Sequence, residues 1–405
     1  MSDYLAPGAT IEEAGLRSKP IEGVPTSTCA FVGPTTKGPV GVASGPLTSF
    51  ADYERIYGGV KDLPFAIDKK ALHRRNYLAH AARAFFDNGG MRLCVVRVVT
   101  GFRTGKGALL PDANEYAAAF ASLEDFGDIS IVAAPGYSAF SDLNQGAVYR
   151  AIQAAMLAHV ADPLRYRMAV LDSPPGATPT AMQALRGFID STRAAVYYPW
   201  VITANPLAGP KSRQPAEIAL PPSGFVCGTY ARSDTERGVL HSPANQDVLG
   251  ALRVERELNT SEQELLNPIG VNCLRAFTGR GLRVWGGRTT STDPEWKYVN
   301  VRRYFNYLGA SVDRATQWAV FEPNGENLWA AMRQTVSDFL TTEWQNGGLI
   351  GSQPPEAFFV RCDRTTMTQD DLDNGRLVCL IGVALMQPAE FMILRIGQRT
   401  TDSSP

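Results

Sequence analysis

Side chains that commonly carry chemistry are scarce in this chain. Its 405 residues include four histidines and six cysteines. None of the cysteines forms a Cys-x-x-Cys pair, and several lie within apolar, strand-like runs, so we predict buried free thiols made in a reducing compartment. His73 and His80 lie seven residues apart, without the cysteine or carboxylate spacing of a zinc site. We therefore expect these histidines on a helix surface, and no metal site.

An excess of charge and long hydrophobic runs are also missing. The chain has 39 basic and 40 acidic residues, a net charge of -1, which argues against a protein that binds duplex nucleic acid. No stretch reaches the roughly 18 apolar residues that a membrane span needs. The first residues show no basic segment followed by an apolar run, so no secretory signal is expected. With 44% hydrophobic residues, the length predicts two or three domains with sizeable cores.

Glycine motifs that bind phosphates are absent as well. A dinucleotide site places Gly-x-Gly-x-x-Gly between the first strand and helix of an α/β region, but residues 135–142 contain one glycine. The segment Gly33-Pro-Thr-Thr-Lys-Gly-Pro39 differs from a phosphate loop, because its lysine precedes the second glycine and Pro39 lacks an N–H donor. We therefore predict a conformationally fixed surface loop there, and no cofactor.

A soluble α/β hydrolase-like enzyme is the alternative that the residues leave open. Asp172 follows a predicted strand, and His241 with Ser223 or Ser242 could complete a catalytic triad. A serine nucleophile needs a recognisable context such as Gly-x-Ser-x-Gly, and neither serine has one. We therefore expect that the protein is not an enzyme and has no catalytic residue.

The middle of the chain contains an ordered series of strand and helix patterns. Residues 129–134, 167–172 and 195–202 are predicted strands. Between them we expect a helix capped by Asp142 and a second helix over residues 180–192. This βαβαβ order predicts a mainly parallel sheet covered by helices, so the fold class is α/β, and α+β over the whole chain.

The C-terminal part is predicted to hold two helices against a small sheet. Asp293-Pro-Glu295 is a helix start, and the helix places Val301, Tyr304, Phe305, Leu308 and Val312 on one face. A second helix is expected to begin at Asn324, with Leu328, Met332, Val336, Phe339 and Leu340 facing inward. Residues 357–362, 376–385 and 390–397 are predicted strands.

We divide the chain into five parts from these patterns. Residues 1–24 are an extended arm, because proline and glycine punctuate them too densely for a helix. Residues 25–110 are an N-terminal part that packs with the core, with strands expected near each end and helices between them. An α/β domain covers residues 111–283, a C-terminal core domain covers 284–386, and a C-terminal arm covers 387–405.

Segments in order along the whole chain resemble the contractile tail sheath proteins of phage tails, pyocin-like particles and related extracellular injection systems. Four segments lie in the C-terminal region: Asn267-Pro-Ile-Gly-Val-Asn272, Val284-Trp-Gly-Gly-Arg-Thr289, Val301-Arg-Arg303 and Phe321-Glu-Pro-Asn324. The others are Pro7-Gly-Ala-Thr-Ile-Glu-Glu13, Pro20-Ile-Glu-Gly-Val-Pro-Thr26, Leu220-Pro-Pro-Ser-Gly224, Tyr230-Ala-Arg-Ser-Asp-Thr-Glu-Arg-Gly238, Ala357-Phe-Phe-Val-Arg-Cys-Asp363 and Gln387-Pro-Ala-Glu-Phe391. No single segment is decisive, and the resemblance rests on the occurrence of these segments in order along the whole chain.

This resemblance implies a subtilisin-like α/β fold for the middle domain, without the catalytic chemistry. It implies a structural protein of a virion tail or tail-like particle, made in the bacterial cytoplasm. Its subunits would stack as hexameric rings around an inner tube protein, with baseplate and terminator or cap proteins as further partners. Neither nucleic acid binding nor direct membrane insertion is expected. The C-terminal sheet would be completed by strands from neighbouring subunits.

Two sets of residues are the predicted interaction sites. For strand donation between subunits we expect residues near both chain ends: Ala9, Thr10, Ile11, Glu12, Glu13, Glu390, Phe391, Met392, Ile393, Leu394, Arg395 and Ile396. For contact with the inner tube we expect Arg333, Asp338 and Glu343, which lie on the helix that follows Asn324.

Overall fold

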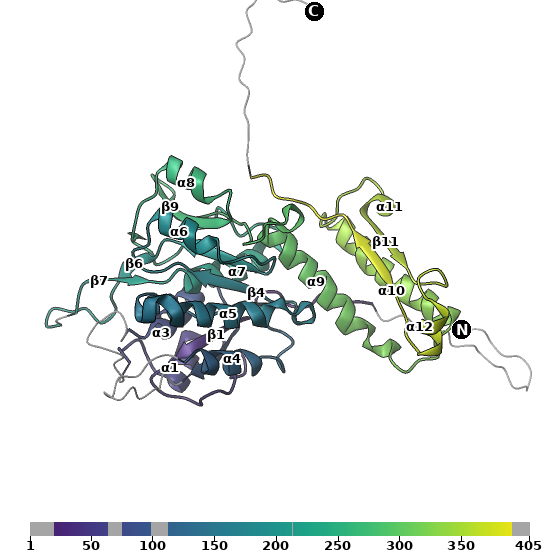
Figure 1. Cartoon of the computed structure of the whole chain (residues 1–405), viewed down its shortest axis with the longest axis horizontal. Coiled ribbons are helices and arrows are strands. Elements are labelled where there is room, and N and C mark those ends of the chain that lie inside the picture. The colour runs from purple at the N-terminus through teal and green to yellow at the C-terminus, as the bar shows by residue number, and fades with distance from the viewer. Residues whose placement is uncertain (1–19, 64–74, 99–111, 213, 391–405) are drawn as a thin grey trace, which may run out of the picture. The chain divides into compact units, whose positions relative to one another are not determined.

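The computed structural model describes residues 20–63, 75–98, 112–212 and 214–390 (Figure 1). It divides into two compact units, each of which is described separately. The large unit comprises residues 25–306 and the segment from 387 onward, and the small unit comprises the residues up to 24 together with 307–386. The boundary at residue 306 falls within helix α9 (Val299–Thr316).

A seven-stranded sheet with the order β10-β9-β5-β4-β3-β1-β2 forms the centre of the large unit. Its strands are β1 (Cys29–Pro34), β2 (Leu93–Val98), β3 (Ile131–Ala133), β4 (Met168–Asp172), β5 (Ala194–Tyr198), β9 (Val271–Phe277) and β10 (Gly281–Trp285). All neighbours are parallel except β9 and β10. The first five strands are almost continuously buried, as parallel strands covered on both faces are. The predicted, mainly parallel sheet is confirmed.

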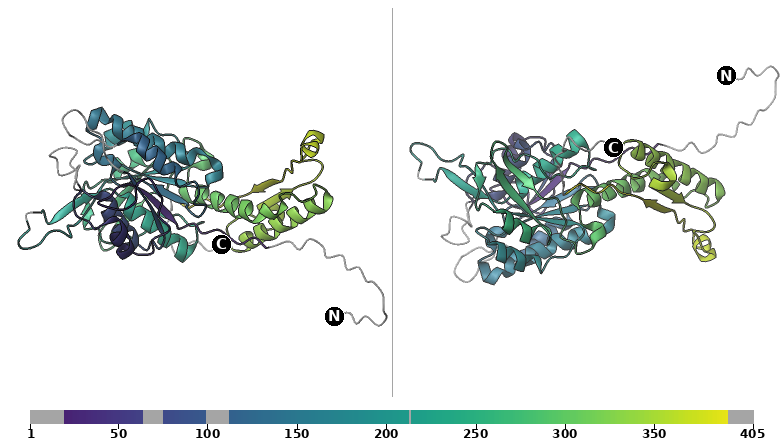
Figure 2. Two further views of the ribbon diagram at one scale, coloured as in Figure 1. Left: turned by 90° about the horizontal axis from the view of Figure 1, so that it is seen from below. Right: turned by 90° about the horizontal axis from the view of Figure 1, so that it is seen from above.

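Helices cover both faces of this sheet (Figure 2). One face packs against α1 (Phe50–Tyr57), α3 (Tyr77–Asp87) and α7 (Ser223–Arg237). The other packs against α4 (Ala113–Ala121), α5 (Ala147–Ala161), α6 (Pro179–Arg186) and α8 (Thr260–Leu266). Alternate residues of the strands belong to the two hydrophobic clusters, because successive side chains of a strand point to opposite faces.

Helices α3 and α7 approach each other closely because α7 carries glycines one turn apart. A Cβ on Gly224 would lie 2.6 Å from the Cα of Ala81, and one on Gly228 would lie 2.5 Å from the carbonyl oxygen of Phe85. Both distances are far below van der Waals contact, so no other residue fits at this crossing without a backbone shift.

Irregular segments cover both edges of the seven-stranded sheet. Residues 41–47 run along β2 and make backbone hydrogen bonds to Leu93, Val95 and Arg97 at 2.7 to 3.0 Å. Residues 245–248 do the same along β10, at 2.6 to 3.0 Å. Paired backbone groups cannot recruit a strand from another chain. The large sheet is therefore closed to strand addition along these segments.

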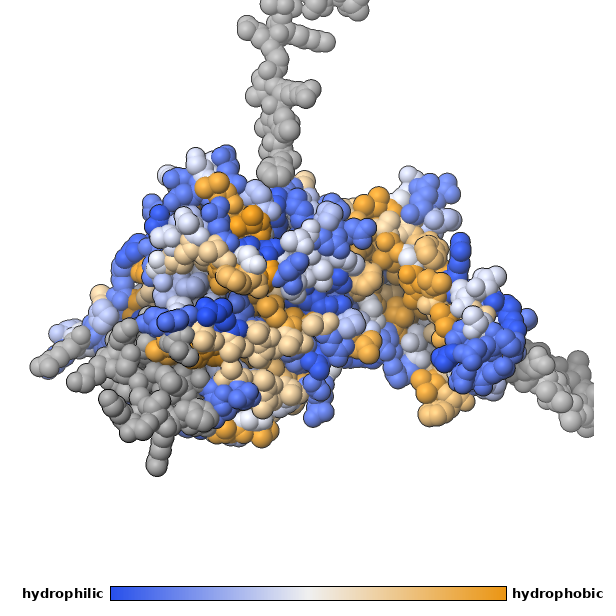
Figure 3. All heavy atoms as spheres, in the orientation of Figure 1, coloured by the Kyte–Doolittle hydropathy of each residue, from blue (hydrophilic) through white to orange (hydrophobic). Residues whose placement is uncertain are grey.

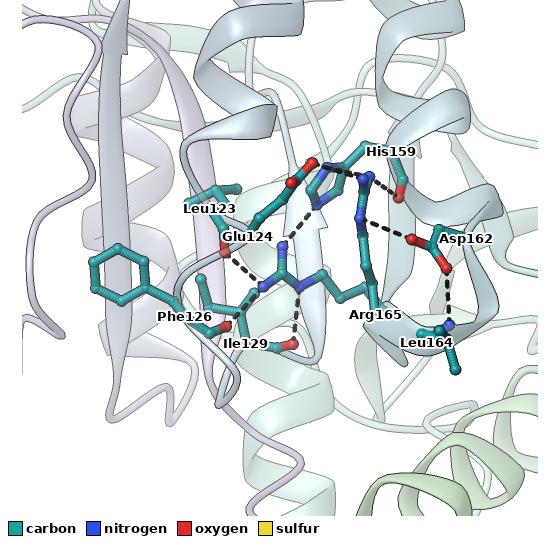
Figure 4. A network of polar contacts seen from close by, with 9 residues as sticks. Leu123, Glu124, Phe126, Ile129, His159, Asp162, Leu164 and Arg165 are labelled. Carbon is teal, nitrogen blue, oxygen red and sulfur yellow. Dashed lines mark hydrogen bonds and ion pairs between the residues drawn. The ribbon is translucent and has the colours of Figure 1, made fainter. Parts of the chain in front are cut away.

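A buried arginine joins the loop after α4 to the start of β4 (Figure 4). Arg167 donates to the carbonyl oxygens of Leu123, Phe126 and Ile129, and its Nη1 lies 2.8 Å from Nε2 of His159. A guanidinium only donates, so this ring nitrogen accepts and is unprotonated. Burial first, and then the neighbouring arginines, lower the pKa of His159 to about 3. The network fixes one end of the sheet through neutral partners.

Three predicted elements in the middle region have wrong boundaries, one being the helix expected over residues 180–192, which ends at Arg186. The helix capped by Asp142 instead begins at Ala147, after a short 3-10 turn whose last residue, Gly146, has a φ of 77°. The predicted strand over residues 195–202 is two strands, since Pro199 has no N–H to continue the ladder. The second piece, β6 (Val201–Ala204), belongs to a separate antiparallel sheet with β7 (Glu217–Leu220) and β8 (Arg253–Val254).

Buried histidines correct another expectation. His80 is 5% exposed, not on a helix surface, because α3 is buried between the sheet and α7, and His73 lies outside the described residues. Burial lowers the pKa of His80 to about 4. The prediction of buried free thiols is confirmed for five cysteines, and Cys379 is a half-buried free thiol. No helix in the described ranges has the length and apolar character to cross a membrane.

The small unit contains α10 (Glu326–Gln345), two short helices, α11 (Pro354–Ala357) and α12 (Gln369–Asp373), and a sheet of β11 (Phe358–Arg361) and β12 (Leu380–Val383). The five inward positions predicted for the α10 helix are all buried. Its predicted start is wrong by two residues, because the Asn324 side chain accepts a hydrogen bond from Trp329 Nε1 instead of capping. Asp293 caps a 3-10 turn rather than α9, and Phe305 is 40% exposed rather than inward.

Gly228→Ala is expected to lower the free energy of unfolding by about 2 kcal/mol, since overpacking costs about 1–3 kcal/mol. The better helix propensity of alanine offsets only part of this loss. Urea denaturation measures it. Gly209→Ala is the control, because no heavy atom lies within 4 Å of its added Cβ. Equal stabilities of the two variants would contradict the close crossing of α3 and α7.

Candidate functional sites

Two residues of the candidate catalytic triad, Asp172 and Ser223, meet at the end of β4. Ser223 donates two hydrogen bonds to the Asp172 carboxylate, from its backbone N at 2.7 Å and from its Oγ at 2.8 Å. Both residues are fully buried. His241 and Ser242 make no hydrogen bond with this pair in the described part of the chain, and Ser242 Oγ accepts from the backbone N of Ala244. The structure therefore brings together Asp172 and Ser223, but without a histidine base between them.

Asp172 instead completes the start of α7. The residue before the helix, Pro222, provides no side-chain cap, so the carboxylate from β4 accepts the N–H of Ser223 in its place. Burial raises the pKa of Asp172 to about 7, although the hydrogen bonds from Ser223 act in the opposite direction. The pair joins a strand end to a helix end, and both residues are fully buried, so the Ser223 hydroxyl is not exposed to a substrate.

A buried ion pair holds the beginning of the described chain against two helices. Arg303 on α9 donates to both carboxylate oxygens of Asp234 on α7, at 2.8 and 2.6 Å. The same guanidinium donates to the carbonyl oxygen of Thr26 at 2.9 Å, and the Thr26 hydroxyl donates to Asp234 at 2.7 Å. The guanidinium also lies 4.8 Å from the ring centroid of Tyr230. We call Arg303, Asp234 and Thr26 the Arg303 clamp.

The two charged side chains of this clamp are almost inaccessible to solvent, at 3% for Arg303 and 4% for Asp234. Burial alone would lower the pKa of Arg303, but the Asp234 carboxylate raises it above its ordinary value. Arg303 therefore remains charged. Such a pair is tolerated only when its hydrogen bonds are complete, and the carbonyl and hydroxyl of Thr26 supply the remaining partners.

A second ionic network fixes the last described residue. Glu390 accepts from Arg288 through both carboxylate oxygens, at 2.7 and 2.6 Å, from Asn267 Nδ2 at 2.8 Å and from the Tyr298 hydroxyl at 3.1 Å. Lys297 lies 3.6 Å away. Burial raises the pKa of Glu390, but the bonds from Arg288 and Asn267 outweigh it and leave the pKa below its ordinary value. We call these residues the Arg288 clamp.

Each clamp joins three of the sequence segments that carry the family resemblance. Thr26, Asp234 and Arg303 come from three of those segments, and Asn267, Arg288 and Glu390 come from three others. Local patterns gave no sign of these pairings, because the partners are as far as 277 residues apart. The charged residues in these segments, which otherwise consist of turns and apolar strands, were a weak indication that the segments pair. Glu390 was predicted only as part of a donated strand.

The small sheet exposes apolar side chains. In the described part of the chain it consists of β11 and β12 alone. Phe359 is 48% exposed, Leu380 is 50% exposed and Ile381 is 37% exposed. Figure 3 shows apolar surface over the small unit in this area. The sheet has two strands, with β11 packed against α10, and further strands would cover its exposed apolar side chains.

The structure describes the residues predicted for tube contact, but only one of those predicted for strand donation. The strand-donation residues 9–13 and 391–396 lie outside the described residues. On α10, Asp338 is exposed, while Arg333 donates to the carbonyl oxygen of Cys362 and Glu343 accepts from the Tyr307 hydroxyl at 3.0 Å. The strand donation and the tube contact stay predictions.

Two family models match adjacent parts of the chain. Residues 111–290 match the phage tail sheath protein central domain, and residues 291–399 match the phage tail sheath C-terminal domain. The match is therefore continuous from the middle of the large unit through the small unit.

Individual sheath proteins are similar as well. The tail sheath protein of Burkholderia phage BcepMu is 27% identical over 311 residues, which make up 72% of this chain and 57% of the phage protein. That of Vibrio phage KVP40 is 27% identical over 188 residues, or 45% of this chain and 27% of the phage protein. The matches thus span from about a quarter to somewhat over half of these relatives' lengths.

Solved sheath structures align over nearly the whole chain. The helical sheath of the anti-feeding prophage in the contracted state has a TM-score of 0.76 and 30% identity, covering 98% of this chain and 100% of that one. The contracted sheath complex of the extracellular contractile injection system PVC has a TM-score of 0.75 and 27% identity, covering 98% and 99%. Neither the family models nor these proteins support the hydrolase alternative.

Asp172→Asn is expected to change stability in a pH-dependent way. Because the folded-state pKa is raised from near 3.8 to about 7, the contribution of Asp172 is fully present in acid and is lost as the pH rises through about 7. Relative to wild type, the variant should gain stability between pH 4 and 8, on the order of a few kcal/mol. Urea denaturation across this range measures the gain, with Asp338→Asn as a surface control. A pH-independent difference would refute the assignment.

Proposed function

Because this chain belongs to the phage tail sheath family, we propose that it is a structural subunit of a contractile sheath. It polymerises as stacked hexameric rings around an inner tube and contracts to drive that tube through a target envelope. The similarity to chains of contracted sheaths in two tail-like injection systems supports this function. The particle is a phage tail or a tail-like injection system, assembled from subunits made in the bacterial cytoplasm. The protein is not an enzyme and needs no cofactor.

The open sheet of the small unit is the observation that carries this proposal. Strands β11 and β12 expose apolar side chains, whereas both edges of the large sheet are covered by the chain's own segments. The sequence predicts one further strand at each chain end, over residues 9–14 and 390–397. Strands donated by neighbouring copies would satisfy the open backbone groups and cover the apolar side chains. A contact of this head-to-tail kind that does not close on itself builds a helical assembly.

The proposed contraction is a mechanical release. The extended sheath forms on the tube and baseplate and is kinetically trapped there. A baseplate signal releases one ring, and the rotation of each ring drives the next toward a shorter, wider and more stable packing. The donated strands stay paired while the large units change neighbours. No nucleotide is consumed.

Helix α10 is the proposed contact with the inner tube, through Arg333, Asp338 and Glu343. The exposed residues of this helix are largely polar. Polar contacts between solvated groups contribute little net free energy, so they can be broken when the sheath widens. Baseplate and terminator or cap proteins are the further proposed partners, and nucleic acid and membrane insertion play no part.

The proposed architecture of the subunit follows the family as well. The large unit contains a subtilisin-like α/β domain over residues 111–283, to which residues 25–110 add β1 and β2 of the same sheet. Residues 284–386 form the C-terminal core domain, and residues 1–24 and 387–405 act as the arms. The Asp172–Ser223 pair occupies a strand end where an enzyme would place catalytic groups, and it serves the fold instead.

Deletion of residues 1–14 is expected to abolish polymerisation while the monomer stays folded. The deletion removes a proposed donated strand but no residue of the described structure. Negative-stain electron microscopy measures the polymer, and circular dichroism with thermal melting measures the fold. A full-length chain that stays monomeric under every salt condition would refute the sheath function. Truncated chains that polymerise normally would refute strand donation alone.

Leu380→Lys is expected to reduce polymerisation at least tenfold without changing the stability of the monomer by more than about 0.5 kcal/mol, as is usual for surface substitutions. The lysine would place a charge among side chains that the donated strands cover. Sedimentation of polymer from monomer measures the effect. Leu164→Lys is the matched control, because Leu164 is 73% exposed in the large unit. Equal losses for both variants would argue against the small sheet as the joining surface.

A further inference from the structure

The chain passes between the two units at three places. These crossings lie between residues 24 and 25, between 306 and 307 within α9, and between 386 and 387. If the sheath contracts as proposed, the force between the small and large units is carried along these three covalent connections. The way in which each connection is fixed to the large unit therefore decides how movement is transmitted.

The Arg303 clamp holds the first two crossings together. Thr26 lies two residues beyond the first crossing, and Arg303 lies in α9 shortly before the second. One guanidinium binds the carbonyl of Thr26 and the carboxylate of Asp234, which belongs to the packed helix α7. Two connections that are remote in sequence are thereby fixed to one point of the large unit.

The Arg288 clamp holds the third crossing. Glu390 follows that crossing by four residues and is bound by Arg288, Asn267 and Tyr298. Tyr298 immediately precedes the first residue of α9, so this clamp also touches the segment that leads to the second crossing. Asn272 on β9 fixes the backbone of Arg288 in turn, with two hydrogen bonds of 2.7 Å. The base of the third connection is thus tied to the central sheet.

The chemistry of both clamps favours position over stability. A buried ion pair adds little net stability, and apolar residues of similar volume often replace such a pair without loss. A bidentate arginine–carboxylate pair, however, defines distance and orientation as apolar contacts do not. We propose that the two clamps form the fixed base from which all three connections leave the large unit, and that Arg303 and Glu390 are positioning residues for the sheath. This inference rests on the proposed function.

Glu390→Gln tests the Arg288 clamp. The amide NH₂ would face an arginine N–H, so one of the two parallel bonds is lost while the size of the side chain is kept. We expect the melting temperature to fall, because the buried Arg288 charge loses its partner, so sheath yield is compared at a temperature where every variant is fully folded. Hydrogen exchange at residues 387–390 should become at least tenfold faster, and the yield of full-length sheath should fall at least tenfold. Arg253→Gln is the control, because it removes the exposed ion pair with Glu217, away from every crossing.

Thr26→Val tests the other clamp without removing a buried charge. The variant keeps the Thr26 carbonyl and the ion pair, but it loses the hydroxyl bond to Asp234. The same three measurements apply, with exchange followed at residues 25–30. Sheath yields equal to that of Arg253→Gln, or losses that only parallel a lower melting temperature, would overturn the positioning role. A wild-type chain that forms no sheath would instead refute the proposed function itself, so the two failures are distinguishable.

Discussion

The buried ion pair between Arg303 and Asp234 is the constraint on which the arrangement of the large unit depends. Two charges removed from water are stable only if every partner is in place. Those partners come from the start of α9, the end of α7 and Thr26 near the beginning of the described residues. A misplaced backbone segment or a mispacked helix would therefore leave an unpaired charge inside the protein.

The same logic accounts for the polar residues in the other motif-rich segments. Arg288, Glu390 and Asn267 have the polar groups of an active site, but their hydrogen bonds are made to one another. Asp172 and Ser223 likewise satisfy each other's hydrogen bonds, where β4 ends and α7 begins. In these clusters the polar groups satisfy one another and thereby fix the geometry of the chain.

Local sequence patterns predicted the helices and strands that are determined by residues close together in the sequence. The parallel strands follow from unbroken apolar runs, and Ser49 and Asn76 cap their helices as short polar residues do. The break at Pro199 was readable and was missed, while the turn at Gly146 depends on a left-handed backbone that periodicity does not encode. The burial of His80 and the two clamps depend on partners brought close only by the fold. The family resemblance found the right segments without revealing which of them touch.

The covered edges of the large sheet have a consequence for the life of the subunit before assembly. A structural protein of this kind is needed in many copies, and a crowded pool of identical sheets is prone to precipitate through accidental strand pairing. Residues 41–47 and 245–248 occupy the hydrogen-bonding groups where such pairing would begin. These segments leave few places on the large sheet where such pairing can start. Newly made chains can thus wait in solution, and when they do join, the number of wrong ways to join is small.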